Sequence, residues 1–163
     1  MKIGEIAVIT HNTQTSEDFI KSICKKIDVK NGIVSFGRFD ANDQLGLHLY
    51  GISLDKEDKN VSWDLISRKM LAYIIFFDWE NFSSLETINP ILDKFSNNVT
   101  APIIIVANVK DMDQPPIPKS FFINKGIAFS ANCRFLFGQA EQPESARKIM
   151  VLITNMLLEK VAG

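Results

Sequence analysis

The chain has few cysteines, almost no net charge and no long hydrophobic run. Its two cysteines, Cys24 and Cys133, lie far apart and outside any C-x-x-C spacing, so the usual signs of a zinc or dithiol site are missing. The formal net charge of -1 leaves no surplus of Lys and Arg to displace counterions from nucleic acid. No apolar run approaches the roughly 18 residues of a membrane span, and the chain enters an apolar segment without an export signal. We therefore expect a cytoplasmic protein with reduced thiols, no bound metal ion and no nucleic-acid partner.

The length and the apolar content of the chain favour a single domain that spans residues 1–163. The hydrophobic fraction of 46% supports one well-buried core, and the chain is too short for two. Continuous apolar runs at Leu71–Phe77 and Pro102–Ala107 are typical of parallel strands that are covered on both faces. Ser83–Phe95 between them has the pattern of a capped amphipathic helix, and a long closing helix starts after Gln142. The order of these segments predicts a βαβ crossover.

A hairpin is indicated earlier in the chain. Ile33–Phe39 and Leu45–Tyr50 are short strand-like runs, and the turn formers of Asp40–Asp43 separate them. Gly126–Ser130 is a candidate for the sixth strand. The whole pattern predicts a three-layer α/β/α sandwich around an about six-stranded, mostly parallel sheet with one antiparallel edge strand.

The segment after the first apolar strand, Gly4–Thr10, contains neither glycine nor lysine. Nucleotide-binding domains place G-x-x-x-x-G-K-[ST] at this point, because glycine amides wrap phosphate, the lysine reaches the terminal phosphates and the hydroxyl holds magnesium. Tight binding of a triphosphate therefore lacks a physical basis. This degenerate phosphate loop consists of His11, Asn12, Thr13, Gln14, Thr15, Ser16, Glu17 and Asp18.

The helix that follows has a local explanation that needs no ligand. Thr15 or Ser16 is expected to be its N-cap, which places Glu17 and Asp18 in the first turn. Carboxylates in a first turn favour a helix by about 0.3–1 kcal/mol each, and here they would repel the phosphates of a nucleotide. An ordinary capped helix is the favoured interpretation.

Three stretches carry a resemblance to a known family. Phe36–Phe39 together with Leu47–Gly51 looks like DFGRI…LHLFGTPGQ, Ile104–Asp111 looks like VVAANKxDL, and Ser130-Ala131 follows the expected last strand. On these residues, nearly the whole chain resembles the small Ras-like GTPases, in particular the bacterial and archaeal branch related to the gliding-motility polarity GTPase. The resemblance implies a P-loop NTPase-like fold.

The resemblance also implies a vestigial guanine-binding site. Asn108 and Asp111 occupy the asparagine and aspartate positions of the NKxD motif, whose aspartate accepts hydrogen bonds from the guanine ring, and Ser130 and Ala131 would complete the site. Val109 stands where the family has the lysine that covers the base. As an alternative, Asp111 simply caps the loop that follows its strand.

The switch regions depart further from the family pattern. Gly51 begins a degenerate switch II, in which Leu54 takes the position of the glycine whose amide senses the terminal phosphate. Asp55 takes the position of the glutamine that orients water. Switch I is reduced to residues 28–32. We therefore expect neither switch to hold magnesium, and no catalytic residue or bound cofactor.

These features predict a pseudo-GTPase that has lost GTP hydrolysis and nucleotide binding and acts through protein contacts. The resemblance implies a partner of the roadblock/LC7 type, another GTPase-like subunit, or a second copy of the chain, with Arg38, Leu47 and Trp63 as the candidate surface. The alternative is a weak binder of GDP or GTP whose phosphate contacts are atypical or supplied by a partner.

Large aromatic residues lie in or near the connections expected at the carboxyl ends of strands. They either close over the emptied nucleotide cleft or form a partner surface. These residues are Trp79, Phe82, Phe121, Phe122, Phe135 and Phe137.

Overall fold

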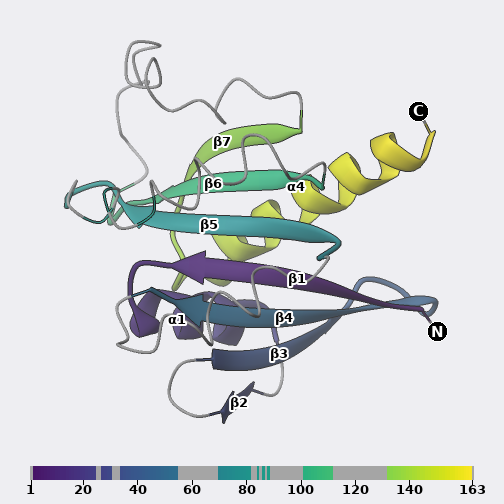
Figure 1. Cartoon of the computed structure of the whole chain (residues 1–163), viewed down its shortest axis with the longest axis horizontal. Helices are drawn as coiled ribbons and strands as arrows, with labels where there is room; N and C mark the ends of the chain where they lie inside the picture. The colour runs from purple at the N-terminus through teal and green to yellow at the C-terminus, as the bar shows by residue number, and fades with distance from the viewer. Residues whose placement is uncertain are drawn as a thin grey trace.

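One mixed β-sheet forms the centre of the molecule (Figure 1). The computed structural model describes residues 2–24, 27–30, 34–54, 70–81, 84, 86, 88, 101–111 and 132–162. Within these residues the sheet has seven strands in the order β2-β3-β4-β1-β5-β6-β7. The strands are β1 (Lys2–Thr10), β2 (Ile27–Lys30), β3 (Val34–Asp40), β4 (Leu45–Ser53), β5 (Ala72–Asp78), β6 (Ile103–Asn108) and β7 (Cys133–Gly138). The helices of the described chain are α1 (Thr13–Ile23) and α4 (Pro143–Ala162).

The sheet is parallel except at one side. β1 pairs in parallel with β4 and β5, and β5, β6 and β7 continue in the same direction. β3 runs antiparallel to both β4 and β2. The prediction of a mostly parallel sheet with an antiparallel pair at one edge is confirmed. β2 adds a strand to the six that were expected, because the chain at Ile27–Lys30 pairs with residues 34–37 of β3.

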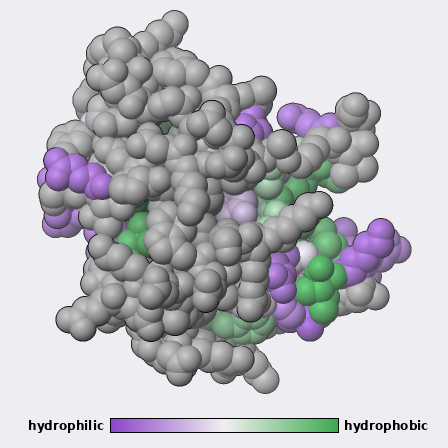
Figure 2. Space-filling view, viewed as in Figure 1, coloured by the Kyte–Doolittle hydropathy of each residue, from purple (hydrophilic) through white to green (hydrophobic). Residues whose placement is uncertain are grey.

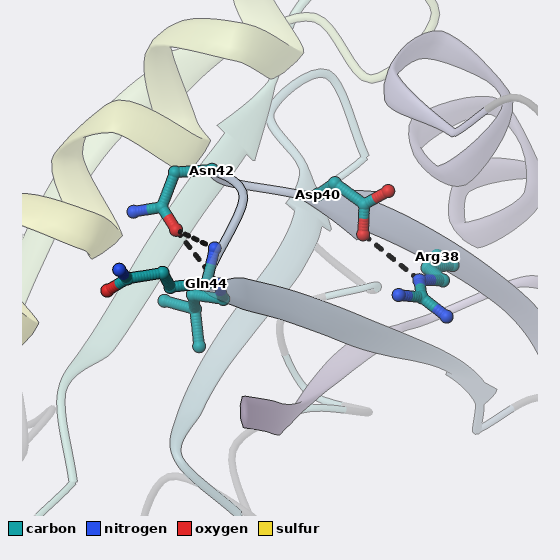
Figure 3. Close-up of polar contacts among 5 residues, drawn as sticks. Arg38, Asp40, Asn42 and Gln44 are labelled. Atoms are coloured by element: carbon teal, nitrogen blue, oxygen red, sulfur yellow. Dashed lines mark hydrogen bonds and ion pairs between the residues drawn. The ribbon is translucent and has the colours of Figure 1, made fainter. Parts of the chain in front are cut away.

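The turn between β3 and β4 contains the residues that the sequence indicated (Figure 3). The Asn42 Oδ1 atom accepts hydrogen bonds from the backbone N–H groups of Gln44 at 2.7 Å and Leu45 at 2.8 Å. An asparagine that bonds to the backbone two residues ahead stabilises a turn without help from other elements. The hairpin prediction is therefore confirmed, together with its chemical reason.

The last strand differs from the expected one. β7 pairs with β6 in parallel, so that Phe135 lies beside Ile105 and Phe137 beside Ala107. These phenylalanines were expected in a connection, and their assignment is corrected. Gly126–Ser130, the expected sixth strand, lies outside the described residues. Because β7 starts at Cys133, Ser130-Ala131 precedes the last described strand.

The two faces of the sheet bury two separate apolar cores, as the alternation of side chains along each strand requires. α1 and α4 contact each other on one face, and Figure 1 shows both of them behind the sheet. Phe19 of α1 and Ile153 of α4 are fully buried there. The second face buries Ile75 and Phe77 of β5 together with Ile88, a helical residue inside the predicted helix 83–95. Helical residues thus pack on both faces, in agreement with the predicted layers.

Candidate functional site

The connection between β1 and α1 consists of only two residues, His11 and Asn12. Asn12 has extended backbone angles, φ -145° and ψ 161°, and its Oδ1 accepts a hydrogen bond from the Thr15 N–H group at 2.8 Å. This is the geometry of an N-cap residue. The prediction that Thr15 or Ser16 caps the helix is therefore wrong. Asparagine caps as well as serine does, and the earlier cap lets the helix start directly after the strand.

The earlier cap moves Glu17 and Asp18 out of the first turn of α1, which contains no acidic residue. Asp18 instead accepts a hydrogen bond through Oδ1 from the Gln14 side-chain amide at 2.7 Å, one turn back along the helix. The expected repulsion between these carboxylates and a phosphate at the helix start has lost its structural basis. This segment differs from a phosphate loop in its length, because only two residues lie between the strand and the helix.

His11 and Asn12 contact each other within this short connection. The Asn12 Nδ2 atom lies 2.6 Å from His11 Nε2. Because the Oδ1 atom of Asn12 accepts from Thr15, its Nδ2 group must be the donor toward His11. His11 Nε2 is therefore the acceptor, and we infer from this network that the proton of the neutral ring is on Nδ1. The Thr10 hydroxyl adds a third local contact by donating to the Asn12 carbonyl at 2.5 Å.

The residues of the degenerate switch II belong partly to the sheet. Gly51 lies within β4 and pairs with Val8 and Ser35. Leu54 follows directly after β4, and its backbone N–H group donates to the Thr10 carbonyl oxygen at 3.0 Å. The Leu54 side chain packs against the core of the second face. The amide at the position that the family resemblance assigns to phosphate sensing therefore has a partner within the chain, while Asp55 lies outside the described residues.

Asn108, at the end of β6, connects the ends of the neighbouring elements. Its Oδ1 atom accepts a hydrogen bond from the Ala140 N–H group at 2.9 Å, in the connection that leads to α4. Its backbone carbonyl accepts from the Trp79 N–H group at 3.0 Å. The next residue, Val109, is buried, and its N–H group donates to the Gly138 carbonyl at 2.9 Å. The side-chain oxygen of Asn108 thus has a structural role in joining β6 to the start of α4.

The other members of the expected guanine site do not join Asn108 in a described pocket. Asp111 is exposed on the segment that follows β6. Ser130 and Ala131 lie outside the described residues. Lys110 extends into solvent, and its Nζ atom lies 3.7 Å from the Glu80 carboxylate. The base contact of Asp111 and its capping role both stay predictions.

The candidate partner surface requires a correction at Leu47. Only 1% of Leu47 is exposed, because it points from β4 into the core beneath the helices. Arg38 is exposed, and its Nε atom donates to the Asp40 carboxylate at 3.0 Å (Figure 3). Trp63 lies outside the described residues. A strand side chain changes face at every residue, so Arg38 and Leu47 cannot belong to one surface when the Arg38 partner in β4 is His48.

The side chains that share a face with Arg38 form an aromatic group that was missed in the sequence. The Phe36 ring lies 4.9 Å from the His48 ring, edge to face, and 5.3 Å from the Tyr50 ring. The Tyr50 hydroxyl donates to the Glu5 carboxylate at 3.3 Å. The signal was the alternation along β4, in which His48 and Tyr50 alternate with buried leucines. Figure 2 shows hydrophobic and hydrophilic described residues side by side where β1 begins and β3 turns into β4.

A second aromatic group contains three of the residues that were expected either to close over a cleft or to form a partner surface. The Trp79 ring lies 5.2 Å from the Phe137 ring, which lies 5.8 Å from Phe135. Phe77 lies 6.2 Å from Phe135 and belongs to the core of the second face. Phe77 is fully buried, and the other three rings are partly buried and pack against that core at the carboxyl ends of β5 and β7. Phe82, Phe121 and Phe122 lie outside the described residues.

The described residues offer little reactive chemistry. Burial raises the pKa of the Cys24 thiol to about 12 and that of Cys133 to about 11, the latter against the opposing effect of the Arg134 charge. Both thiols therefore stay protonated and unreactive near neutral pH. In the part of the chain that the structure describes, no three His, Cys, Asp or Glu side chains gather closely enough to hold a metal ion. Nor is any described helix long and apolar enough to span a membrane.

Fold and geometry together define an α/β protein with a mostly parallel sheet, in which two residues join β1 to α1 and the Leu54 amide bonds to the end of β1. No protein-family model matches the chain, and no curated protein matches its sequence.

Proposed function

We propose that this chain is a pseudo-GTPase: a degenerate member of the Ras-like superfamily that binds a protein partner in the cytoplasm and has lost GTP hydrolysis and tight nucleotide binding. The observation that carries the proposal is the two-residue connection between β1 and α1. The order of the helices and strands supports the proposed membership of the Ras-like superfamily. A central β1 is followed by a helix, an antiparallel hairpin, three further parallel strands and a closing helix.

The short connection argues against nucleotide binding because of where the backbone amides lie. A phosphate loop needs a run of glycine amides that are free to turn toward the anion. Of the eight positions that the motif would occupy, residues 13–18 already belong to α1. Amides beyond the first turn of a helix donate to carbonyls four residues back and cannot serve a ligand. The first-turn amide of Thr15 donates to Asn12.

A second contact removes the group that would respond to a terminal phosphate. The Leu54 amide donates to the Thr10 carbonyl, so it links the end of β4 to the end of β1. A switch of the family type must release such a segment when the phosphate leaves. The contact supports a domain with one conformation, which acts as a scaffold for a partner.

The partner surface in this proposal is the sheet face at β3 and β4. Phe36, Arg38, His48 and Tyr50 supply aromatic area and a positive charge there, and aromatic residues and arginine are enriched in protein interfaces. They replace Leu47, which is buried. The family resemblance favours a partner of the roadblock/LC7 type or another GTPase-like subunit.

The test is a titration of nucleotide-free protein with fluorescent GDP and GTP, with and without magnesium and with ATP as the base control. A loop that lacks the phosphate amides, the lysine and the magnesium hydroxyl loses several charge-assisted hydrogen bonds of about 1.5–3 kcal/mol each. We expect no saturation below about 1 mM. Guanine-specific saturation in the micromolar range that Asp111→Ala weakens would overturn the proposal in favour of the weak guanine-nucleotide binder.

A further inference from the structure

The outer side of α4 carries the two most exposed large apolar side chains of the described chain. Val151 is 54% exposed and Leu158 is 62% exposed. Other apolar residues of α4, such as Ile149 and Ile153, face the sheet and are fully buried. The exposed pair therefore lies on the side opposite to the core, where packing of the fold gives no reason for large apolar groups.

Val151 and Leu158 form one stripe because they are seven residues apart. Seven residues advance a helix by about 700°, which is only about 20° short of two full turns, and by about 10 Å along its axis. The exposed Asn155 lies between them on the same side. In Figure 1 the last turns of α4 extend beyond the ends of β6 and β7.

We propose that this stripe is a self-association surface, on which α4 of one copy packs antiparallel against α4 of a second copy. A twofold axis midway between residues 154 and 155 brings Val151 of each copy to the same height as the partner's Leu158. One pair of contacts is thereby made twice, as the self-complementary patch of a twofold dimer requires. The surface uses the spacing of knobs in antiparallel helix packing and needs no further element.

The charged residues beside the stripe fit the same register. Lys148 and Glu159 are both exposed and lie on the same flank of the stripe. In the antiparallel arrangement Lys148 lies about two residues, or about 3 Å along the axis, from the height of the partner's Glu159. A lysine side chain spans such an offset. Among the described residues of one copy, Lys148 has a wide contact of 4.0 Å with Glu144, and both of these side chains are largely exposed. This charge complementarity favours a second copy of the chain as the occupant.

The surface that α4 offers to a second copy is small. α4 has 20 residues and is therefore about 30 Å long, so a pair of such helices makes an interface at the small end of specific complexes. We expect a reversible dimer that forms at high micromolar concentration. The proposal does not depend on the proposed pseudo-GTPase function, because Val151 and Leu158 lie on the outer side of α4 and none of the vestigial guanine-binding or phosphate-loop residues belongs to that helix.

Sedimentation equilibrium over a concentration series up to about 1 mM tests the proposal, since interfaces of this size are weak. The expected result is a mass that rises from monomer toward dimer. Leu158→Lys should raise the dissociation constant at least about tenfold. Ile3→Lys is the matched control, because Ile3 is 53% exposed on β1, outside the stripe, and should leave the dissociation constant unchanged. Circular dichroism verifies that each variant is folded.

A charge exchange tests the antiparallel register separately. Lys148→Glu alone and Glu159→Lys alone should each weaken the dimer, because each places like charges opposite one another. The double variant should restore the parent dissociation constant within about threefold, as a coupled pair does. A monomeric parent protein at every concentration overturns the proposal. So does a dimer that is insensitive to Leu158→Lys, or a double variant that is weaker than both single variants.

Discussion

Replacement of Asn12 by alanine tests the contact that closes the β1–α1 connection. The change removes the acceptor of the Thr15 N–H group and the donor toward His11. Loss of an N-cap costs about 0.5–2 kcal/mol, and Thr15 is almost completely buried, so water cannot replace the lost acceptor. We expect a loss at the upper end of this range, about 1.5–2 kcal/mol.

Urea unfolding measures this loss. With a slope of about 2 kcal/mol per molar urea, the midpoint should fall by about 0.7–1 M while the slope stays constant. Asn12→Ser keeps a capping oxygen and should recover most of the loss, whereas Gln14→Ala, an exposed change in the same turn, should cost about 0.5 kcal/mol or less. The reasoning is refuted if Asn12→Ala shifts the midpoint no more than Gln14→Ala, or if serine is as destabilising as alanine.

Three further outcomes follow from contacts of the described residues. Asn108→Ala should destabilise the protein by about 1–3 kcal/mol in urea unfolding, because the Ala140 amide loses its acceptor, and Asn108→Asp, which keeps an oxygen, should cost less. Leu47→Ala should cost about 2–5 kcal/mol, whereas Arg38→Ala should change stability by about 0.5 kcal/mol or less; equal losses would contradict the assignment of Leu47 to the core. Burial raises the pKa of the Cys24 thiol from 9.0 to about 12. The contribution of the buried, protonated thiol to the free energy of unfolding is therefore complete below pH 9 and declines between pH 9 and about 12. A thiol reagent at pH 8 should label Cys24 in urea and not in the native protein.

The interior strands could be predicted from the sequence because burial on both faces requires an almost continuous run of apolar residues. β5 and β6 are covered on both faces, so nearly all their side chains are apolar and the runs at 72–77 and 103–107 stand out. The β3–β4 turn was equally readable, since Asn42 forms it through its own backbone contacts. Proline at the first position of α4 marks the start of that helix. In each of these cases the deciding interaction is local or periodic.

The edge strands and the helix cap could not be predicted in the same way. β7 is an edge strand with Arg134 exposed between apolar neighbours, a pattern that a loop also shows. Asn12, Thr15 and Ser16 are all good capping residues, and the choice among them depends on tertiary packing, which buries Thr15 and Ser16 inside α1. Leu47 was placed on a surface because the register of β3 against β4, which pairs Arg38 with His48, is a long-range property.

On the proposed function, the carboxyl ends of β1, β4 and β6 have been rebuilt as well as deprived of a ligand, because three polar groups there have partners within the chain. Loss of a ligand alone leaves amides and side-chain oxygens that have no partner, and each such buried group costs about 1–3 kcal/mol. Here the Thr15 amide donates to Asn12, the Leu54 amide to Thr10, and the Asn108 side chain accepts from Ala140. These three contacts join β1, β4 and β6 to their neighbouring connections, so each stabilises one arrangement of the edge. On the proposed function, the partner therefore recognises a constant surface, and regulation must come from the partner or from the concentration of the protein.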